Sequence, residues 1–575
     1  MQASASAFPF LAGILSHIFY FRRGEHHLYI RTYYKLFFLT ILAIALGIFF
    51  APPESQAMFA EGPSAFFYYL LGIYVSLLTY RLTPLHPLSS FPGPVGYKLS
   101  SLHLSSQLIK DATAFRRVQA LHQQYGDFVR MGPNDLSITH PEGVEKLYGP
   151  GSRCSKGAWY DLNHPRRSLQ STRDHAAHAQ MRRVWSKAFS DKSLRELEVR
   201  INGYRRKLLS LISSAADGSV ESPSSSIRSV DMGLGSGHVM DVTKLFNMYS
   251  FDVMGDMAFG KSFRMLDLPE QHWVMDAMTN GALKPHGWML PMWLFLTLTA
   301  MPKLNEEWWK FINYCNAMVD ERVRELQGVV KEGKMEKEEK AEKDIMAWLL
   351  KPLEARDITE RDMLQLYADS KLIMAAGSDT TTTTLTVLIY ELLRNPDELA
   401  KLREELSPFY VDGQVDYAKI QKLNRLNGAI NEVLRLFPPV PTAIHRVTPP
   451  EGITVGHKYI PGGMDVWCSQ YAIGRSEHLY PHATSFIPER WYSKPELVVD
   501  QKAFSPFSGG AYSCIGKNLA LQNIRNTLSG VIMNYDFSIN DEGERDMNMF
   551  EGGIIDHFTI GLPRLRVQFS NRKEV

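Results

Sequence analysis

Three apolar stretches in the first 82 residues restrict how this 575-residue chain can fold. They run from Ala7 to Phe21, from Leu36 to Ala51 and from Ala65 to Tyr80. A helix that spans a bilayer needs about 20 mostly apolar residues, so the second and third stretches are predicted to span. The first is shorter and contains Ser16 and His17, so it could instead lie in the membrane interface. We therefore expect two or three membrane helices.

A secretory signal peptide is the alternative interpretation of the first stretch. No small-residue cleavage site is obvious there, and two further apolar segments follow it, so this alternative is disfavoured. Basic residues predict the orientation, because short loops rich in Lys and Arg stay in the cytosol. The loop after the first stretch contains such residues, whereas the loop after the second contains Glu54 and Glu61 and no Lys or Arg. The chain after Tyr80 is therefore expected on the cytosolic side.

Composition and cysteine spacing exclude several classes of protein. Lys and Arg number 63 against 61 Asp and Glu, a formal charge of +2, which gives no reason to expect nucleic acid as a partner. The four cysteines are scattered, with no CxxC pair for zinc and no dense disulfide framework. A reducing compartment fits this pattern, and Cys154, Cys315 and Cys468 are predicted to be small buried hydrophobic residues.

The chain is expected to divide into a membrane anchor at 1–82, a proline-rich elbow at 83–94 and a catalytic domain at 95–575. The catalytic domain shows no repeat and is predicted to be mainly α with a small β region, including a hairpin within 125–140. Two stretches, 217–238 and 331–343, are typical of inserted surface loops. The first contains the sequence GLGSG, but no strand leads into it, so it is interpreted as a linker and not as a dinucleotide-binding loop.

The segment 504–520, FSPFSGGAYSCIGKNLA, carries the clearest chemical signal in the sequence. Glycines at 509, 510 and 516 surround Cys514, so the backbone is expected to turn sharply and to approach a flat ligand closely. A helix-like run begins directly after Gly516. Backbone N–H groups and a helix N-terminus both stabilise a thiolate, so Cys514 is predicted to be an anion.

This segment resembles the haem-binding loop of the cytochromes P450, whose pattern is FxxGxRxCxG. Phe507, Gly510, Cys514 and Gly516 match the pattern, and Tyr512 stands where the family has an arginine. The resemblance implies that Cys514 binds the iron of haem b. Tyr512 can donate a hydrogen bond to a haem propionate but supplies no positive charge.

A second motif of the family lies in the helix-prone run from Leu364 to Leu393. Ala376 to Thr381, AGSDTT, resembles the oxygen-binding motif. We expect Gly377 to weaken the helix locally and leave space over the iron, and Asp379 and Thr380 to pass protons toward bound oxygen. A Ser/Thr cluster that bonds only to its own helix is the alternative interpretation.

The remaining motifs concern the shape and charge of the pocket. Glu432 and Arg435 (ExxR) lie one helical turn apart, and Arg490 in FIPERW matches the arginine that completes a buried network in the family. By the same resemblance, His178, Arg182 and Arg446 are candidate partners of the haem propionates. Arg182 and Arg446 are then expected to carry most of the charge that Tyr512 does not supply.

The resemblance, which extends from about Phe91 to the C-terminus, implies the P450 fold and a haem-thiolate monooxygenase. Such an enzyme inserts one oxygen atom of O2 into a small organic substrate. The chain has no flavin domain, so electrons are expected from a separate NADPH-cytochrome P450 reductase, with the catalytic domain on the cytosolic face of the endoplasmic reticulum. The anchor and the sequence LSHIFYFRRGEHH resemble fungal members of secondary metabolism. Two alternatives remain: an isomerase or dehydratase that does not use O2, and a non-enzymatic haem sensor.

Overall fold

The computed structural model describes residues 2–217, 239–267, 273–276, 289–301, 303, 306–331, 344–354, 356–411 and 414–572. The loops expected at 217–238 and 331–343 lie outside these residues, apart from the first residue of each.

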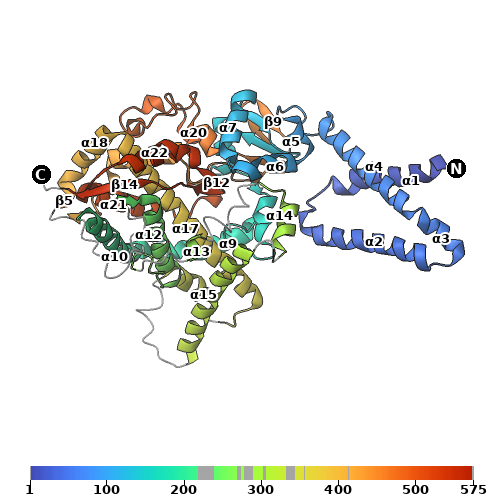
Figure 1. The fold of residues 1–575 in the computed structure, drawn as a ribbon, viewed down its shortest axis with the longest axis horizontal. Coiled ribbons are helices and arrows are strands. Elements are labelled where there is room, and N and C mark those ends of the chain that lie inside the picture. Colours follow the sequence, from blue (N-terminus) through green and yellow to red (C-terminus); the bar gives the residue numbers. More distant parts are fainter. Residues whose placement is uncertain are drawn as a thin grey trace.

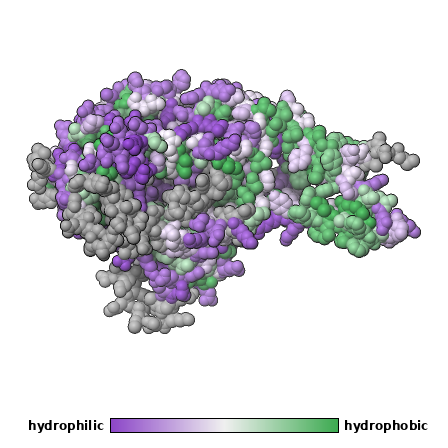
Figure 2. Space-filling view, in the orientation of Figure 1, coloured by the Kyte–Doolittle hydropathy of each residue, from purple (hydrophilic) through white to green (hydrophobic). Residues whose placement is uncertain are grey.

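An anchor of four helices extends to one side of the molecule (Figure 1). These are α1 (Gln2–Ser16), α2 (Ile30–Phe50), α3 (Pro53–Ala60) and α4 (Gly62–Leu82), with short turns η1 (His17–Phe21) and η2 (His27–Tyr29) between the first two. The segments His27–Phe50 and Pro53–Leu82 are long and apolar enough to cross a membrane, as the sequence predicted, by length and composition only. Figure 2 shows hydrophobic residues gathered over this end of the molecule.

The first apolar helix, α1, packs directly against α4. A Cβ atom at Gly13 would overlap the carbonyl oxygen of Tyr69, and one at Gly72 would overlap that of Phe10. These two glycines therefore let the helix backbones approach closely, as small residues do in membrane helix pairs. From the sequence, this stretch could span the membrane or lie in its interface. Its pairing with α4 was not expected.

The proline-rich segment after α4 consists of turns and lies on the catalytic domain. Arg130 of β1 joins the two parts: its N–H donates to Pro92 O at 2.7 Å, and its guanidinium donates to Arg81 O at 3.2 Å. Leu88 and Phe91 are buried in the same region. Arg130 thus ties the end of α4 and the end of the proline-rich segment to the first strand of the domain.

The catalytic domain is mainly helical. Its first helices are α5 (Val95–Leu99), α6 (Ser101–Asp111), α7 (Ala114–Tyr125), α8 (Pro141–Tyr148), α9 (His175–Ala188), α10 (Asp191–Ala216), α12 (Val242–Phe259) and α13 (Trp273–Asp276). They are followed by α14 (Met292–Thr299), α15 (Glu306–Lys331), α16 (Ile345–Leu350), α17 (Glu360–Arg394), α18 (Pro396–Leu406), α19 (Asn424–Leu436), α20 (Gln470–Gly474), α21 (Lys517–Asn534) and α22 (Asp541–Gly553).

Short strands form one larger sheet and several small ones. The five-stranded sheet has the order β1 (Phe128–Arg130), β2 (Asp135–Ile138), β10 (Asp465–Trp467), β7 (Arg446–Val447), β3 (Ser155–Lys156). A three-stranded sheet has the order β11 (Tyr535–Ser538), β14 (Arg566–Asn571), β4 (Val239–Asp241). The two-stranded hairpins are β5 (Tyr410–Val411) with β6 (Gln414–Val415), β8 (Ile453–Val455) with β9 (Lys458–Ile460), and β12 (Ile555–His557) with β13 (Thr559–Gly561). The antiparallel pairing of β1 with β2 confirms the hairpin predicted within 125–140.

The long helix α17 lies at the centre of the domain (Figure 1). It begins with a capping box, in which the Thr359 side chain accepts from the Asp362 N–H and the Asp362 carboxylate accepts from the Thr359 N–H. Helices α12, α15, α19 and α21 and the β13 strand pack against it. Most side chains from Thr381 to Leu392 are buried, so this half of α17 forms part of the core on all its faces.

Candidate active site

Cys514 lies in a tight loop between Tyr512 and the start of α21. Its backbone N–H donates to Phe507 O at 2.8 Å, which closes the loop. Gly510 has a φ of 58°, and a Cβ atom there would lie 2.6 Å from Gly149 O. The close approach at Gly510 is therefore to the chain's own backbone and not to a ligand, which corrects the role that we expected from the sequence.

The electrostatics of Cys514 combine two opposing effects. Burial raises the pKa of the thiol, while hydrogen bonds from the N–H groups of Gly516 and Lys517 and the charge of Arg182 lower it. The first effect is the larger, so the pKa of the thiol lies above its ordinary value when no metal is bound. Cys514 is nevertheless open to a cavity inside the protein. A bound metal ion would displace the thiol proton, because a coordinating thiol is deprotonated outright.

This cavity, of about 340 Å³, brings most of the predicted site residues together. Among the predicted residues, its walls include His178, Arg182, Thr380, Arg446, Phe507, Tyr512, Cys514 and Gly516. Asp379 and Gly510 do not line it. Residues from the loop before α21 thus share one cavity with residues from α17, although the two segments are more than a hundred positions apart in the sequence.

Helix α17 is continuous through the AGSDTT motif, contrary to the expected local weakening. The space beside Gly377 is filled by the thioether of Met254 from α12, which a Cβ atom would overlap. Gly377 therefore allows two helices to pack closely. Ala376, in the preceding position, is exposed to the cavity, and the Thr380 hydroxyl donates to Ala376 O at 3.0 Å. Small side chains, and not a break in the helix, leave the room above Cys514.

Asp379 points away from the Cys514 cavity. Its Oδ2 accepts a hydrogen bond from the Thr559 hydroxyl at 3.1 Å and lies 3.6 Å from His557 Nε2. Successive residues of an α-helix are rotated by about 100°, and here Thr380 lines the Cys514 cavity while Asp379 does not. The sequence analysis placed them together as one proton-delivery pair, and the structure separates their side chains.

Positive charge gathers at one end of the cavity without a carboxylate to balance it. Lys156 of β3 and Arg446 of β7 are direct partners in the register of the sheet, and Arg182 of α9 lies at the same end. No Asp or Glu occurs among the described residues that line the cavity. Like charges placed opposite each other in a sheet are unfavourable, so this arrangement indicates a site for an anionic group.

The three cations differ in how many of their donors are already used. Arg182 donates to Ser513 O at 2.7 Å and to Ser513 Oγ at 2.9 Å, so it also holds the cysteine loop. Arg446 is 2% exposed and donates to Tyr160 Oη, yet its Nε has no partner among the described residues. Burial and the nearby arginines lower the pKa of Lys156 to about 6, so near neutral pH it becomes fully charged only when an anion lies beside it. Arg446 is therefore the buried cation with the most unsatisfied donor capacity.

Lys156 was missed by the sequence analysis. Nothing in its local sequence distinguishes it from a surface lysine, and only the pairing of β3 with β7 brings it beside Arg446.

His178, which was predicted, is 3% exposed, and burial lowers its pKa to about 3. It is a neutral hydrogen-bonding group near neutral pH and carries no charge.

Tyr512 contributes its ring as well as its hydroxyl group. The Lys156 ammonium lies 4.7 Å and the Arg446 guanidinium 4.9 Å from the ring centroid, within the range of cation–π contacts. The His178 ring packs edge-on against Tyr512 with a centroid separation of 4.7 Å. The tyrosine that replaces the family's arginine thus holds the two cations in place. Together, a soft thiol ligand, small residues on α17 and an unbalanced cationic corner fit a flat macrocycle with carboxylate arms, as in haem.

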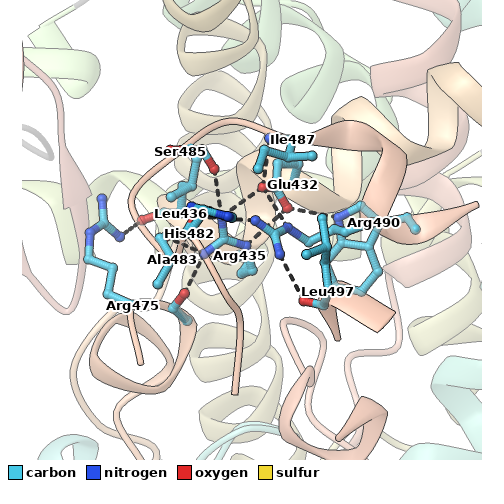
Figure 3. A network of polar contacts seen from close by, with 12 residues as sticks. Glu432, Arg435, Leu436, Arg475, His482, Ala483, Ser485, Ile487, Arg490 and Leu497 are labelled. Atoms are coloured by element: carbon cyan, nitrogen blue, oxygen red, sulfur yellow. Dashed lines mark hydrogen bonds and ion pairs between the residues drawn. The ribbon is translucent and has the colours of Figure 1, made fainter. Parts of the chain in front are cut away.

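The predicted Glu432–Arg435–Arg490 network is formed (Figure 3). Glu432 of α19 is fully buried and accepts from Arg435 at 2.7 and 3.0 Å and from Arg490 Nε at 2.9 Å. The Ile487 N–H and Trp491 Nε1 complete its shell, each at 2.9 Å. The two arginines donate to further backbone carbonyls, so the network fixes α19 to the segment that leads toward the cysteine loop.

A larger cavity of about 540 Å³ lies between the start of α2 and helices α14, α15 and α17, away from Cys514. Close to it, Glu25, His27 and Asp161 are grouped as metal ligands could be. The Arg173 guanidinium lies among them and donates to Glu25 and Asp161 at 2.6 Å. This group therefore joins the anchor to the catalytic domain through an ion-pair network and does not resemble a metal centre.

Comparison with known proteins agrees with this geometry. The sequence profile of the family described as "Cytochrome P450" matches residues 94–562. "Cytochrome P450 monooxygenase notG'" of Aspergillus versicolor is 42% identical over 98% of this chain and 97% of its own length. "Tryprostatin B 6-hydroxylase" of Neosartorya fischeri is 40% identical, and "Cytochrome P450 monooxygenase FCK2" of Fusarium pseudograminearum is 35% identical, each over 98% of this chain and 97% of the relative.

Proposed function

Since this chain belongs to the cytochrome P450 family and is a haem monooxygenase of secondary metabolite biosynthesis, we propose that it hydroxylates a largely apolar metabolite with haem b as its cofactor. The observation that carries the proposal is the single cavity that joins Cys514 to the AGSDTT segment of α17. Apolar side chains, including Leu372, Val440 and Phe558, line further parts of the cavity. Such a lining favours an apolar substrate.

Haem b would supply dioxygen binding and transfer of one oxygen atom to a carbon of the substrate. The protein supplies the environment for this chemistry. Cys514 would hold the iron, and the N–H groups of Gly516 and Lys517 would support its sulfur when it is negatively charged. Ala376 and the closely packed Gly377 have small side chains, so the surface of α17 that faces Cys514 projects little into the cavity. A flat ring and a substrate can therefore share the cavity.

The cationic corner is proposed to hold the propionates of haem b. Arg446 has the buried, unsatisfied donors, Lys156 lies next to it, and Arg182 ties the corner to the cysteine loop. A propionate charge would offset the mutual repulsion of these cations, which is largest when the corner contains no anion. Tyr512 and His178 orient the corner through ring contacts and single hydrogen bonds.

Haem retention tests this division of roles. Tyr512→Phe keeps the ring and its cation contacts and loses one hydrogen-bonding group, so the expected cost is about 0.5–1.5 kcal/mol. Arg446→Ala leaves a propionate without its buried partner, and the expected cost is about 3–5 kcal/mol. The measurement is transfer of haem from each purified variant to an apo-haem acceptor protein. Faster haem loss from Tyr512→Phe than from Arg446→Ala would contradict the proposal.

Proton delivery is proposed for Asp379 and Thr380 in different roles. The Thr380 hydroxyl faces the cavity and can donate to a group bound there, while Asp379 lies behind it and can restore a proton from the other side of the helix. An enzyme that only rearranges an oxygenated substrate needs no such pair. The monooxygenase reaction is therefore favoured over the isomerase alternative by residues of this chain as well as by its relatives.

Thr380→Ala is expected to retain the haem spectrum and to lose coupling. Product formed per NADPH should fall roughly tenfold or more, because positioned proton transfer contributes about 10²–10⁴ and water can replace the hydroxyl only in part. Thr386→Ala is the matched control, since Thr386 lies on the same helix, is fully buried and does not line the cavity. The assay uses NADPH-cytochrome P450 reductase and the metabolite that accumulates when the gene is deleted. Unchanged coupling in Thr380→Ala would show that the assigned role is wrong.

We further propose the cellular setting of the enzyme. Residues 1–82 form the anchor, 83–94 the elbow and 95–575 the catalytic domain, which faces the cytosol at the endoplasmic reticulum. The basic residues before α2 and the acidic loop before α4 support this orientation. The close contact of α1 with α4 supports a third helix in the membrane. Electrons would come from NADPH-cytochrome P450 reductase in the same membrane, because no segment of this chain has a flavin or nicotinamide motif.

A further inference from the structure

A second, smaller cavity of about 120 Å³ lies on the other side of α17 from the Cys514 cavity. Its walls come from α12, α17, the end of α22 and the β12–β13 hairpin, and they include Thr243, Asn247, Thr383 and Gly553. Gly553 is exposed on the surface of the protein, whereas Thr243 and Thr383 are buried. The cavity therefore reaches from the molecular surface into the core, and its volume is well above the ~10–15 Å³ that one water molecule needs.

Asp379 and His557 are the only titratable residues among the described residues that line this cavity. His557 is 2% exposed, and neither of its ring nitrogens has a hydrogen-bond partner among the described residues. Its Nε2 lies 3.6 Å from Asp379 Oδ2, too far for a direct hydrogen bond. The other nearby carboxylate, Asp556 on the same strand, is engaged by Thr442 and by the Phe558 N–H. A buried imidazole with two open nitrogens beside a polar cavity is suited to bind water.

The hairpin holds His557 and Thr559 in fixed positions. The two residues are register partners across the turn of the β12–β13 hairpin, at Phe558. A Cβ atom at Gly561 would lie 2.8 Å from His557 Cε1, so the glycine leaves room for the imidazole ring. Thr559 donates to Asp379 Oδ2 at 3.1 Å and also lines the Cys514 cavity. Thr559 is thus the side chain that reaches both Asp379 and the cavity of the reaction.

We propose that His557, Asp379 and Thr559 form a relay that carries protons from the surface through the smaller cavity to the Cys514 cavity. The proposal rests on the proton-delivery role given to Asp379 above and adds its source and its route. Water in the smaller cavity protonates His557, His557 protonates Asp379 through water, and Asp379 passes the proton to the Thr559 hydroxyl. Thr559 gives its own proton to the Cys514 cavity as it receives the new one, so each group returns to its starting state. His557 and Thr559 are relay residues and do not bind the iron.

A purely structural role for these residues predicts a different arrangement. A histidine that served only to pair with Asp379 would lie within hydrogen-bond distance of it and would have a partner for its second nitrogen. His122 shows such an arrangement: it contacts Gly126 O at 2.8 Å and Ser137 Oγ at 2.7 Å. Two observations favour a path for protons: the open nitrogens of His557 in the smaller cavity, and the position of Thr559, which lines the Cys514 cavity and donates to Asp379.

Coupling measurements test the last step of the relay. Thr559→Val should reduce the product formed per NADPH by roughly tenfold or more, with the haem spectrum retained, because the valine cannot pass a proton. Thr559→Ser should restore coupling, since a serine keeps the hydroxyl. Thr383→Val is the matched control, because Thr383 lines the same small cavity but donates to Ile560 O and not to Asp379. Wild-type coupling in Thr559→Val would overturn the proposal.

Hydrogen exchange tests the first step without any turnover. Exchange of the imidazole C2 proton in D2O, followed by mass spectrometry, requires that water reach the ring. His557 should exchange faster than His122, although it is less exposed, at 2% against 8%. Exchange of His557 no faster than that of His122 would show that the cavity is dry and would also overturn the relay. If Thr380→Ala uncouples the enzyme and Thr559→Val does not, the proposed function stands and only the relay fails.

Discussion

Replacing Cys514 with serine is expected to abolish the red-shifted Soret band of the reduced, CO-bound protein and, with it, NADPH-driven product formation. A serine hydroxyl is a hard ligand with a much higher pKa than a thiol, so it cannot act as a soft anionic donor to iron. The effect should be complete, because no other cysteine among the described residues lines the cavity. The measurement is the CO difference spectrum of the dithionite-reduced variant, together with its haem content.

Cys154→Ser is the matched control for this experiment. Cys154 is 4% exposed and lies outside the Cys514 cavity, so the same chemical change should leave the spectrum unchanged. A normal red-shifted band in Cys514→Ser would show that another residue binds the iron. A change in Cys154→Ser as large as that in Cys514→Ser would show that the spectrum reports general unfolding.

Glu432→Gln is expected to lower the free energy of unfolding by about 3–5 kcal/mol, the range for breaking a buried ion pair by removal of one partner. Glu432 accepts five hydrogen bonds in a fully buried position, and two of its donors are buried arginines. A glutamine keeps the size but turns one acceptor into a donor and leaves the charges of Arg435 and Arg490 unbalanced. Thermal unfolding in detergent or nanodiscs, followed by loss of the haem spectrum, is the measurement.

Glu489→Gln provides the comparison at a partly exposed site. Glu489 pairs with Lys401 at 2.9 Å, and the lysine side chain is 38% exposed. Pairs at the surface contribute about 0–1 kcal/mol, so the same substitution there should have little effect. If the two variants lower the free energy of unfolding equally, the network around Glu432 contributes no more to stability than a surface ion pair.

Sequence reasoning succeeded where a motif carries its own local geometry. The glycine-bracketed Cys514 loop, the long helix with AGSDTT and the ExxR pair depend on residues a few positions apart, and α17 and α19 are formed as expected. The two segments predicted to span a membrane are also local features, because length and apolar composition decide whether a helix can cross a bilayer. The family match and the relatives agree with the resemblance drawn from these motifs.

Several expectations about individual side chains were wrong because they depended on neighbours distant in sequence. Gly377 was expected to loosen its helix, but Met254 of another helix packs into the space beside it. Gly510 was expected to face a ligand and instead contacts residue Gly149.

The sequence alone was enough to predict the class of chemistry and the buried Glu432 network. It also predicts Cys514 as the iron ligand and an N-terminal membrane anchor. The three-dimensional packing was needed to show which way Asp379 points, that Lys156 lies beside Arg446, and that Thr559 connects Asp379 to the Cys514 cavity. The difference depends on how far apart in the sequence the interacting residues lie. Helix formation, thiolate ligation and membrane insertion follow from composition and spacing within one segment. The direction of a side chain and the charge around it are set by strands and helices that the sequence places hundreds of residues away.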